Sequence, residues 1–210
     1  MPFTETRGGV FGVYWLVFCS NGWSGLQWIP QPQAVGVRVS PAVAARVAIG
    51  RLPLPVPVVH HNPDRMDGRP ATVVGVKTWW WVSSSSFRVL RQTVRVGGAW
   101  ATVTATPVRS VWRSGSSATP TVTCAGPGRA YDPSRSSSSQ STYCSTVYRE
   151  SSASQPQTGP SPNDRYFTAS VTVVWRVTWV GSGGSHGSLP PMSRTESFPI
   201  AVEDVQAVNN

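Results

Sequence analysis

The chain has 210 residues, enough to bury a hydrophobic core as one large or two small domains, so its length does not require a metal or dense cross-linking. Only 13% of the residues are charged, against a usual share of about 25%, and the abundance of Val, Thr, Ser and Trp predicts a mainly β protein. The net charge of +9 admits anionic partners, but the 17 Arg residues and the single Lys are scattered singly without a recognised nucleic-acid-binding motif, so nucleic-acid binding is not expected.

Residues 1–82 are predicted to form a small N-terminal α+β segment that begins with a hairpin. Residues 10–18 are continuously apolar, which is typical of a strand covered on both faces. The turn-forming sequence Ser20-Asn21-Gly22 follows, and residues 26–29 then supply a returning strand.

The same apolar run has some features of a signal peptide. Arg7 precedes it, but the bulky Phe18 stands before Cys19 where a lipoprotein signal needs a small residue, and no small-residue cleavage site follows. We therefore expect a buried strand over residues 10–18 and an export signal that is missing from this chain. No apolar run approaches the ~20 residues of a membrane-spanning helix.

One short helix and a proline-rich stretch follow the hairpin. Ser40 can cap a helix over residues 41–49, Pro41 suits its first position, and Gly50 can end it. Proline alternates with apolar residues over residues 52–57, which predicts an extended chain that cannot donate within a central ladder. We expect this stretch to lie along the edge of a sheet or to cross to the next element.

A polar loop over residues 60–68 leads to a further strand over residues 72–82, and the serine tract over residues 83–86 then separates the two parts of the chain. Residues 83–210 are predicted to form one C-terminal domain. Its expected strands cover residues 99–106, 108–112, 119–124, 142–148 and 166–180, with a last strand beginning at residue 198.

The strand over residues 166–180 has the clearest alternation in the chain. Val171, Val173, Trp175, Val177 and Trp179 fall on one face, whereas polar residues dominate the other. Six or seven short strands with turn clusters between them predict an immunoglobulin-like β-sandwich rather than an α/β enzyme fold.

The cysteine content bears on the compartment. Three cysteines permit one disulfide with one cysteine left over, or a partner cysteine outside this chain. Low charge and many Ser, Thr, Gly and Pro residues, together with a plausible disulfide, favour an extracytoplasmic, oxidising location.

One stretch of the chain resembles a known family. The chain contains, in this order, Trp112, a glycine-containing turn, Thr123-Cys124-Ala125-Gly126-Pro127-Gly128, Tyr131-Asp132, Cys144, Tyr148 and the Val173–Trp179 strand. This order resembles that of the polycystic-kidney-disease-type (PKD-like) domain. The chain is similar, over residues 99–181, to secreted or membrane-anchored actinobacterial proteins that carry such a domain at the C-terminus.

The resemblance implies a β-sandwich outside the cytoplasm and a disulfide between Cys124 and Cys144. In the chain-entropy model, a bridge closing a loop of this length contributes about 3 kcal/mol. The resemblance implies no activity, because PKD-like domains are mostly spacers and interaction modules. It also shows a departure, since Arg113 and Ser116 replace the acids of the family's usual turn while Gly115 retains the turn. Cys19 would remain unpaired or bonded to a partner outside the chain.

Trp79, Trp80 and Trp81 form the most prominent candidate ligand surface. An exposed aromatic face can stack on a sugar ring, but alternation places Trp79 and Trp81 on one face of a strand and Trp80 on the other. At least one side of this strand is therefore expected to belong to the core, as most of the tryptophans are.

No other cluster predicts a reaction or a metal site. His60 and His61 lie near Asp64 and Asp67, but adjacent histidines on an extended chain point to opposite faces, so a solvated loop is the preferred interpretation. His186 lies in a glycine-rich turn. No known catalytic motif or phosphate-binding loop occurs, so we expect no catalytic residues, no metal and no cofactor.

The sequence therefore predicts a non-catalytic, cell-envelope-associated protein that binds or spaces other components. Its partner would be an unidentified protein or cell-wall polymer. Two alternatives remain open, namely a component of an envelope-spanning secretion or conjugation apparatus, and a glycan- or wall-polymer-binding protein that uses exposed Trp and Arg. An apolar patch on the N-terminal segment would favour the apparatus component.

Overall fold

The computed structural model describes residues 4–8, 10–18, 20, 24–31, 39–66 and 68–204. It is mainly β, as predicted, and one α-helix occurs in these ranges. The elements are β1 (Thr4–Arg7), β2 (Val10–Phe18), β3 (Ser24–Pro30), α1 (Pro41–Gly50), β4 (Val59–Asn62), β5 (Arg65–Met66), β6 (Arg69–Pro70), β7 (Thr72–Val73), β8 (Lys77–Val82), β9 (Leu90–Val96), β10 (Ala99–Arg113), β11 (Val122–Cys124), β12 (Ser145–Val147), β13 (Phe167–Gly181), β14 (His186–Ile200) and β15 (Val202–Glu203), with short 3-10 turns at Ser137–Ser139, Ser152–Ser154 and Ser182–Gly184.

The N-terminal strands β1, β2 and β3 form a three-stranded antiparallel sheet, which confirms the predicted hairpin. On one face Trp28 lies so close over Gly12 that a Cβ there would be 2.3 Å from the indole ring. The prediction that β2 is covered on both faces is wrong for the described chain. Phe11, Trp15 and Leu16 of β2 are 40%, 56% and 56% exposed, because among the described strands β2 has only β1 and β3 beside it.

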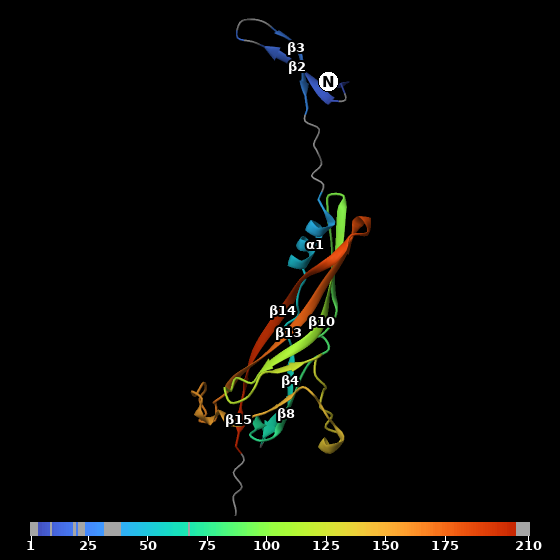
Figure 1. Ribbon diagram of the computed structural model, residues 1–210. Coiled ribbons are helices and arrows are strands. Elements are labelled where there is room, and N and C mark those ends of the chain that lie inside the picture. Colours follow the sequence, from blue (N-terminus) through green and yellow to red (C-terminus); the bar gives the residue numbers. More distant parts are fainter. Residues whose placement is uncertain are drawn as a thin grey trace, which may run out of the picture.

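A larger sheet dominates residues 39–204, with the strand order β11-β10-β13-β14 and β9 paired to β10 (Figure 1). Along β13 the predicted alternation is confirmed, because Val171, Val173, Trp175 and Val177 are buried and Trp179 is half-buried. These side chains supply one side of the hydrophobic core.

Strand β10 is continuous from Ala99 to Arg113, so the predicted break between residues 106 and 108 is wrong. The register against β13 shifts between Pro107 and Arg109 instead. Because proline cannot donate to the ladder, a bulge accommodates it. The buried positions change from odd to even numbers across this bulge, from Ala105 to Ser110 and Trp112.

Strand β14 begins at residue 186 rather than at residue 198 as predicted. Its first two-thirds carry few apolar side chains, which suits an edge strand, since β13 is the one described strand that pairs with β14. Pro190 and Pro191 lie where the register against β13 shifts. His186, predicted to lie in a turn, is the first residue of this strand.

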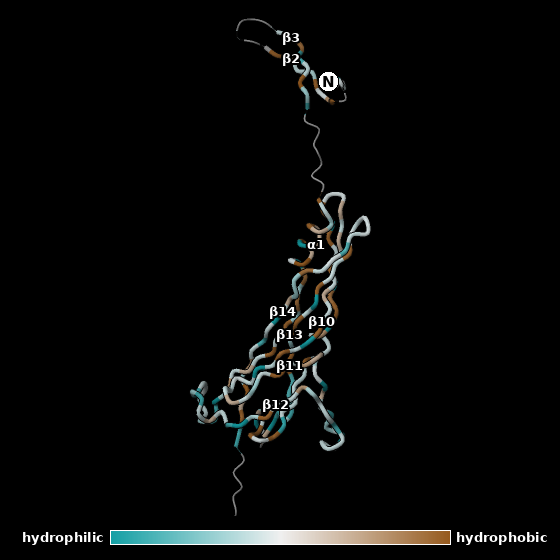
Figure 2. The backbone as a smooth tube through the Cα atoms, in the orientation of Figure 1, coloured by the Kyte–Doolittle hydropathy of each residue, from teal (hydrophilic) through white to brown (hydrophobic). Residues whose placement is uncertain are grey.

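The helix prediction is confirmed. Ser40 caps α1 through its hydroxyl, which accepts from the Val43 N–H, and Pro41 is the first helical residue. Ala44, Ala45 and Ala48 are fully buried, and α1 packs against β9, β10 and β13. Figure 2 shows the largely hydrophobic character of α1, which its sequence of alanine, valine and isoleucine produces. Small side chains allow the helix to approach the sheet closely.

A second sheet, β12-β8-β4, shares its core with the first through Trp80. The Trp80 ring stacks on Trp112 at 5.2 Å and meets the edge of Phe198 at 5.7 Å. Elements before and after the boundary predicted at residue 82 therefore contribute to one hydrophobic core. The proline-rich residues 52–57 form no strand.

The last strand, β15, pairs in parallel with β7, so Val202 lies beside Thr72. Arg69 and Glu203 form an ion pair at 3.0 Å next to this pairing. In the ranges that the structure covers, no helix is both long and apolar enough to cross a membrane.

Candidate functional site

The two faces of β8 have different environments. Alternation along the strand directs Lys77, Trp79 and Trp81 to the outer face and Trp80 to the core. On the neighbouring strand β4, His60 pairs with Trp81 and Asn62 pairs with Trp79. The outer face of this small sheet therefore combines aromatic rings with polar side chains.

Two hollows lie beside this outer face, and we call them together the aromatic groove. The first has a volume of about 530 Å³ and the second about 360 Å³. Residues lining the first hollow are Val59, His60, His61, Asn62, Asp64, Trp81, Tyr131 and Pro133. Residues lining the second are Asn62, Pro63, Val76, Lys77, Trp79, Tyr131, Ser137, Gln140 and Ser141. Both volumes fall in the range of ~300–1,000 Å³ typical of ligand sites.

Only part of the predicted tryptophan surface is available to a ligand. Trp80 is 1% exposed and Trp79 is 6% exposed, so neither presents a ring face to solvent. Trp81 is half-buried and His60 stacks on it at 5.5 Å. The tryptophan of β8 that can contact a ligand directly is therefore Trp81.

Tyr131 belongs to the groove but was not predicted from the sequence. Its ring meets Trp79 edge-on at 5.4 Å, and it lines both hollows. The signal for it is weak, because Tyr131 lies in a polar loop far from β8 in sequence. The flanking residues Gly128 and Pro133 indicate only that the backbone turns on either side of Tyr131.

Hydrogen bonds within the loop hold Tyr131 in place. The Gln140 side chain accepts from the Asp132 N–H at 2.9 Å and donates to the carbonyls of Asp132 and Arg135. Asp132 accepts from the hydroxyl and N–H of Ser134, and these hydrogen bonds lower the pKa of its carboxyl below the usual value. The loop is ordered by its own polar side chains rather than by burial.

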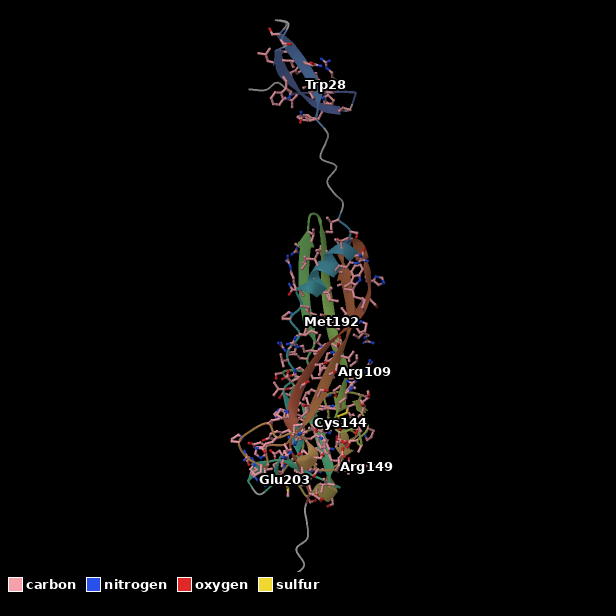
Figure 3. The ribbon with its side chains drawn as sticks, turned by 90° about the vertical axis from the view of Figure 1, so that its left-hand side faces the viewer. Trp28, Arg109, Cys144, Arg149, Met192 and Glu203 are labelled. Carbon is pink, nitrogen blue, oxygen red and sulfur yellow. A yellow bond between two sulfur atoms is a disulfide. The ribbon has the colours of Figure 1, made fainter. Side chains whose placement is uncertain are left out.

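A disulfide closes the base of this loop. Cys124 and Cys144 are bonded and fully buried, with their Cα atoms 5.5 Å apart, which confirms the pairing that the family resemblance implied (Figure 3). Ser110 donates to the Gly126 carbonyl at 2.7 Å, which ties the start of the loop to β10. The groove wall that carries Tyr131 is thus anchored to the core at both ends.

His60 and His61 diverge, as expected for neighbours on a strand. The His60 ring lies on the outer face and its Nε2 is 2.8 Å from the Ser83 hydroxyl. His61 lies beside Trp80, and its Nδ1 donates to the Pro63 carbonyl at 2.7 Å. Burial lowers the pKa of His61 below its ordinary value of 6.5, although the Pro63 carbonyl and Asp64 oppose this shift.

The structure assembles no metal centre from these residues. Among the described side chains, no three of His, Cys, Asp and Glu are placed to hold one ion. Asp67 and Cys19 lie outside the described residues, and the His186 Nδ1 hydrogen-bonds to the Gly184 carbonyl at 3.2 Å.

The turn that follows Trp112, which lacks the acids of the family pattern, is held by local hydrogen bonds. Gly115 adopts a φ of +83°, and the Ser116 hydroxyl donates to Glu150 at 2.6 Å. The Tyr148 hydroxyl donates to the Ser114 carbonyl, and burial raises the pKa of Tyr148 far above its usual range. This turn is a structural element of the core.

Comparison of the chain with protein-family models, with curated proteins and with solved structures gave no match.

Proposed function

We propose that this protein is an extracytoplasmic, cell-envelope-associated binding module, built on a PKD-like β-sandwich, that binds a carbohydrate polymer in the aromatic groove. The disulfide Cys124–Cys144 supports the oxidising compartment. Two sheets that share one core around Trp80 support the sandwich.

The observation that carries the proposal is the combination of Trp81 and Tyr131 with polar side chains in one open groove. An aromatic ring contacts the apolar C–H face of a sugar, while neighbouring polar groups bind its hydroxyls. Asn62 can both donate and accept, and Asp64 accepts. His60 supplies a further ring nitrogen at the same face.

Binding accounts for this groove better than hydrolysis does. Most glycoside hydrolases need two carboxyl groups that flank the scissile bond. Among the described residues that line the two hollows, Asp64 is the one carboxylic acid. We therefore propose that the protein holds a polymer without cleaving it.

A glycan array and sedimentation with insoluble wall polysaccharide test this function. We expect the intact protein to bind, and Trp81→Ala to reduce binding at least tenfold because stacking on Trp81 is lost. Trp15→Ala is the matched control, since Trp15 is exposed but lies on β2. Loss of binding in the Trp15 variant alone, or no binding by the intact protein, would contradict the proposal.

A second candidate function is that of a component of an envelope-spanning apparatus. It is favoured by the exposed apolar side chains of the N-terminal sheet, including Phe11, Trp15 and Leu26. For this function, we expect cross-linking to specific envelope proteins that is abolished by Trp15→Ser with Leu26→Ser and retained by Trp81→Ala. Equal cross-linking by both variants would eliminate this candidate.

A further inference from the structure

The two hollows of the aromatic groove adjoin each other. Asn62 and Tyr131 line both of them. Trp81 lies in the first hollow, whereas Trp79 and Lys77 lie in the second, and these three residues follow one another along the outer face of β8. A ligand that follows β8 would therefore cross both hollows beside Tyr131.

The two hollows differ in charge. Asp64 lines the first hollow, and Lys77, the only lysine of the chain, lines the second. In the described part of the chain, the Lys77 ammonium forms no ion pair or hydrogen bond, so its charge is directed to solvent. An ammonium group binds a carboxylate or phosphate as a point charge.

The boundary between the hollows is preformed. Tyr131 is held against Trp79 at 5.4 Å, and Gln140 fixes the loop that carries it. A groove whose walls are already ordered loses little conformational entropy when a ligand binds. The fixed spacing of the hollows should therefore make affinity depend on the number of sugar units in the ligand.

We propose that the aromatic groove binds at least two consecutive units of a linear acidic polysaccharide. One unit stacks at Trp81 in the first hollow, and the unit in the second hollow carries a carboxylate that contacts Lys77. This inference rests on the proposed carbohydrate-binding function and adds the length and charge of the ligand.

Calorimetric titration of the full chain with two matched series tests the inference. The acidic probes are oligogalacturonates of one to six units, and the neutral probes are N-acetylglucosamine oligomers of the same lengths. We expect acidic oligomers to bind more tightly than neutral ones, and affinity to rise between one unit and two or three units and then to level off.

Variants separate the contributions of charge and length. Lys77→Gln should weaken binding of acidic oligomers by up to about fivefold, the size of one exposed charge pair, and leave neutral oligomers unchanged. Lys77→Arg should retain binding. Arg95→Gln is the matched control, because it also removes one positive charge, from an exposed position on β9. Tyr131→Ala should remove the dependence on length.

The outcomes distinguish this inference from the function on which it rests. If a single unit binds as tightly as a trimer, or if Lys77→Gln affects both series equally, the inference is overturned while carbohydrate binding stands. If only neutral oligomers bind, the assignment of Lys77 is overturned. If neither series binds and wall polysaccharide is not retained, the proposed function itself fails.

Discussion

At the scale of single residues, Gly128 shows how closely the loop with Tyr131 packs on β8. Its φ is +86°, and a Cβ there would lie 2.2 Å from the Trp80 carbonyl oxygen. The Pro127 carbonyl also accepts from the Val82 N–H at 2.9 Å. The backbone of residues 127–128 thus covers β8 next to the groove, and only glycine fits at this approach.

We expect Gly128→Ala to destabilise the protein by about 2–4 kcal/mol, because backbone strain and a backbone clash add together. Gly68→Ala is the matched control, since Gly68 has a φ of +79° but a Cβ added there would meet no atom within 4 Å. The Gly68 variant should show the strain alone. Urea unfolding measures both, and equal losses would refute the packing argument.

His61 makes stability depend on pH. Burial lowers the pKa of His61 below 6.5, so the folded protein favours the neutral ring, whose Nδ1 donates to Pro63. As the pH falls below 6.5, the unfolded chain takes up the proton first, and this contribution to stability is lost as the pH falls through the folded pKa. Above 6.5 the contribution is fully present.

The melting temperature of the intact protein should therefore fall more steeply between pH 7.5 and pH 5 than that of His61→Asn. The two proteins differ at residue 61 alone, so the difference between the two curves reports His61. Parallel curves for the intact protein and His61→Asn would contradict this expectation.

The disulfide stabilises the fold and closes the base of the loop that carries Tyr131. Replacing Cys124 and Cys144 together by Ala should lower the free energy of unfolding by about 3 kcal/mol, because the unfolded chain regains the freedom of a loop with a sequence separation of 20. Denaturation of the intact protein with and without reductant measures the same quantity. If reductant also lowers the free energy of unfolding of the double variant, the loss does not come from this disulfide.

At the scale of elements, adjacent residues of β8 should have different roles, with Trp80 stabilising the fold and Trp81 binding the ligand. Trp80→Ala should cost about 3–5 kcal/mol of unfolding free energy, because its fully buried ring contacts Trp112, Tyr148 and Phe198. Trp81→Ala should cost much less stability and reduce ligand binding instead. Thermal unfolding and calorimetry on both variants check this, and similar losses of stability would contradict the two-faced strand.

The elements that the sequence predicted well are those with strong local signals. The helix at Pro41 has a cap, a suitable first residue and alanines on one face, and β13 has strict alternation. The prediction was wrong where long-range pairing overrides local preference. Proline suggested a break in β10, but β13 pairs with β10 on both sides of the bulge and maintains the strand.

The candidate site was predicted only in part for the same reason. Alternation separated Trp80 from Trp79 and Trp81, and the family resemblance paired the cysteines. The contribution of Tyr131 depends on a loop folding back over β8 from about 50 residues further along the chain, through contacts between elements distant in sequence. Such contacts leave no periodic pattern in the sequence.

At the scale of the whole molecule, residues before and after position 82 share one core, and the division between two segments predicted there does not correspond to a gap in packing. Helix α1 covers the sheet near one end of residues 39–204, whereas Cys144, Arg149 and Glu203 lie toward the other end (Figures 1 and 3). The groove is thus supported by the core as a whole, including strands from both segments.

The parallel pairing of β15 with β7 has a consequence for the order in which the protein folds. Val202 and Glu203 close a sheet with Thr72 and Val73, which precede them by about 130 residues. The N–H groups of Thr72 and Val74 donate to the carbonyls of Ala201 and Glu203, so these two hydrogen bonds cannot form before residue 203 has been synthesised. During synthesis from the N-terminus, this small sheet is therefore among the last parts of residues 39–204 to form.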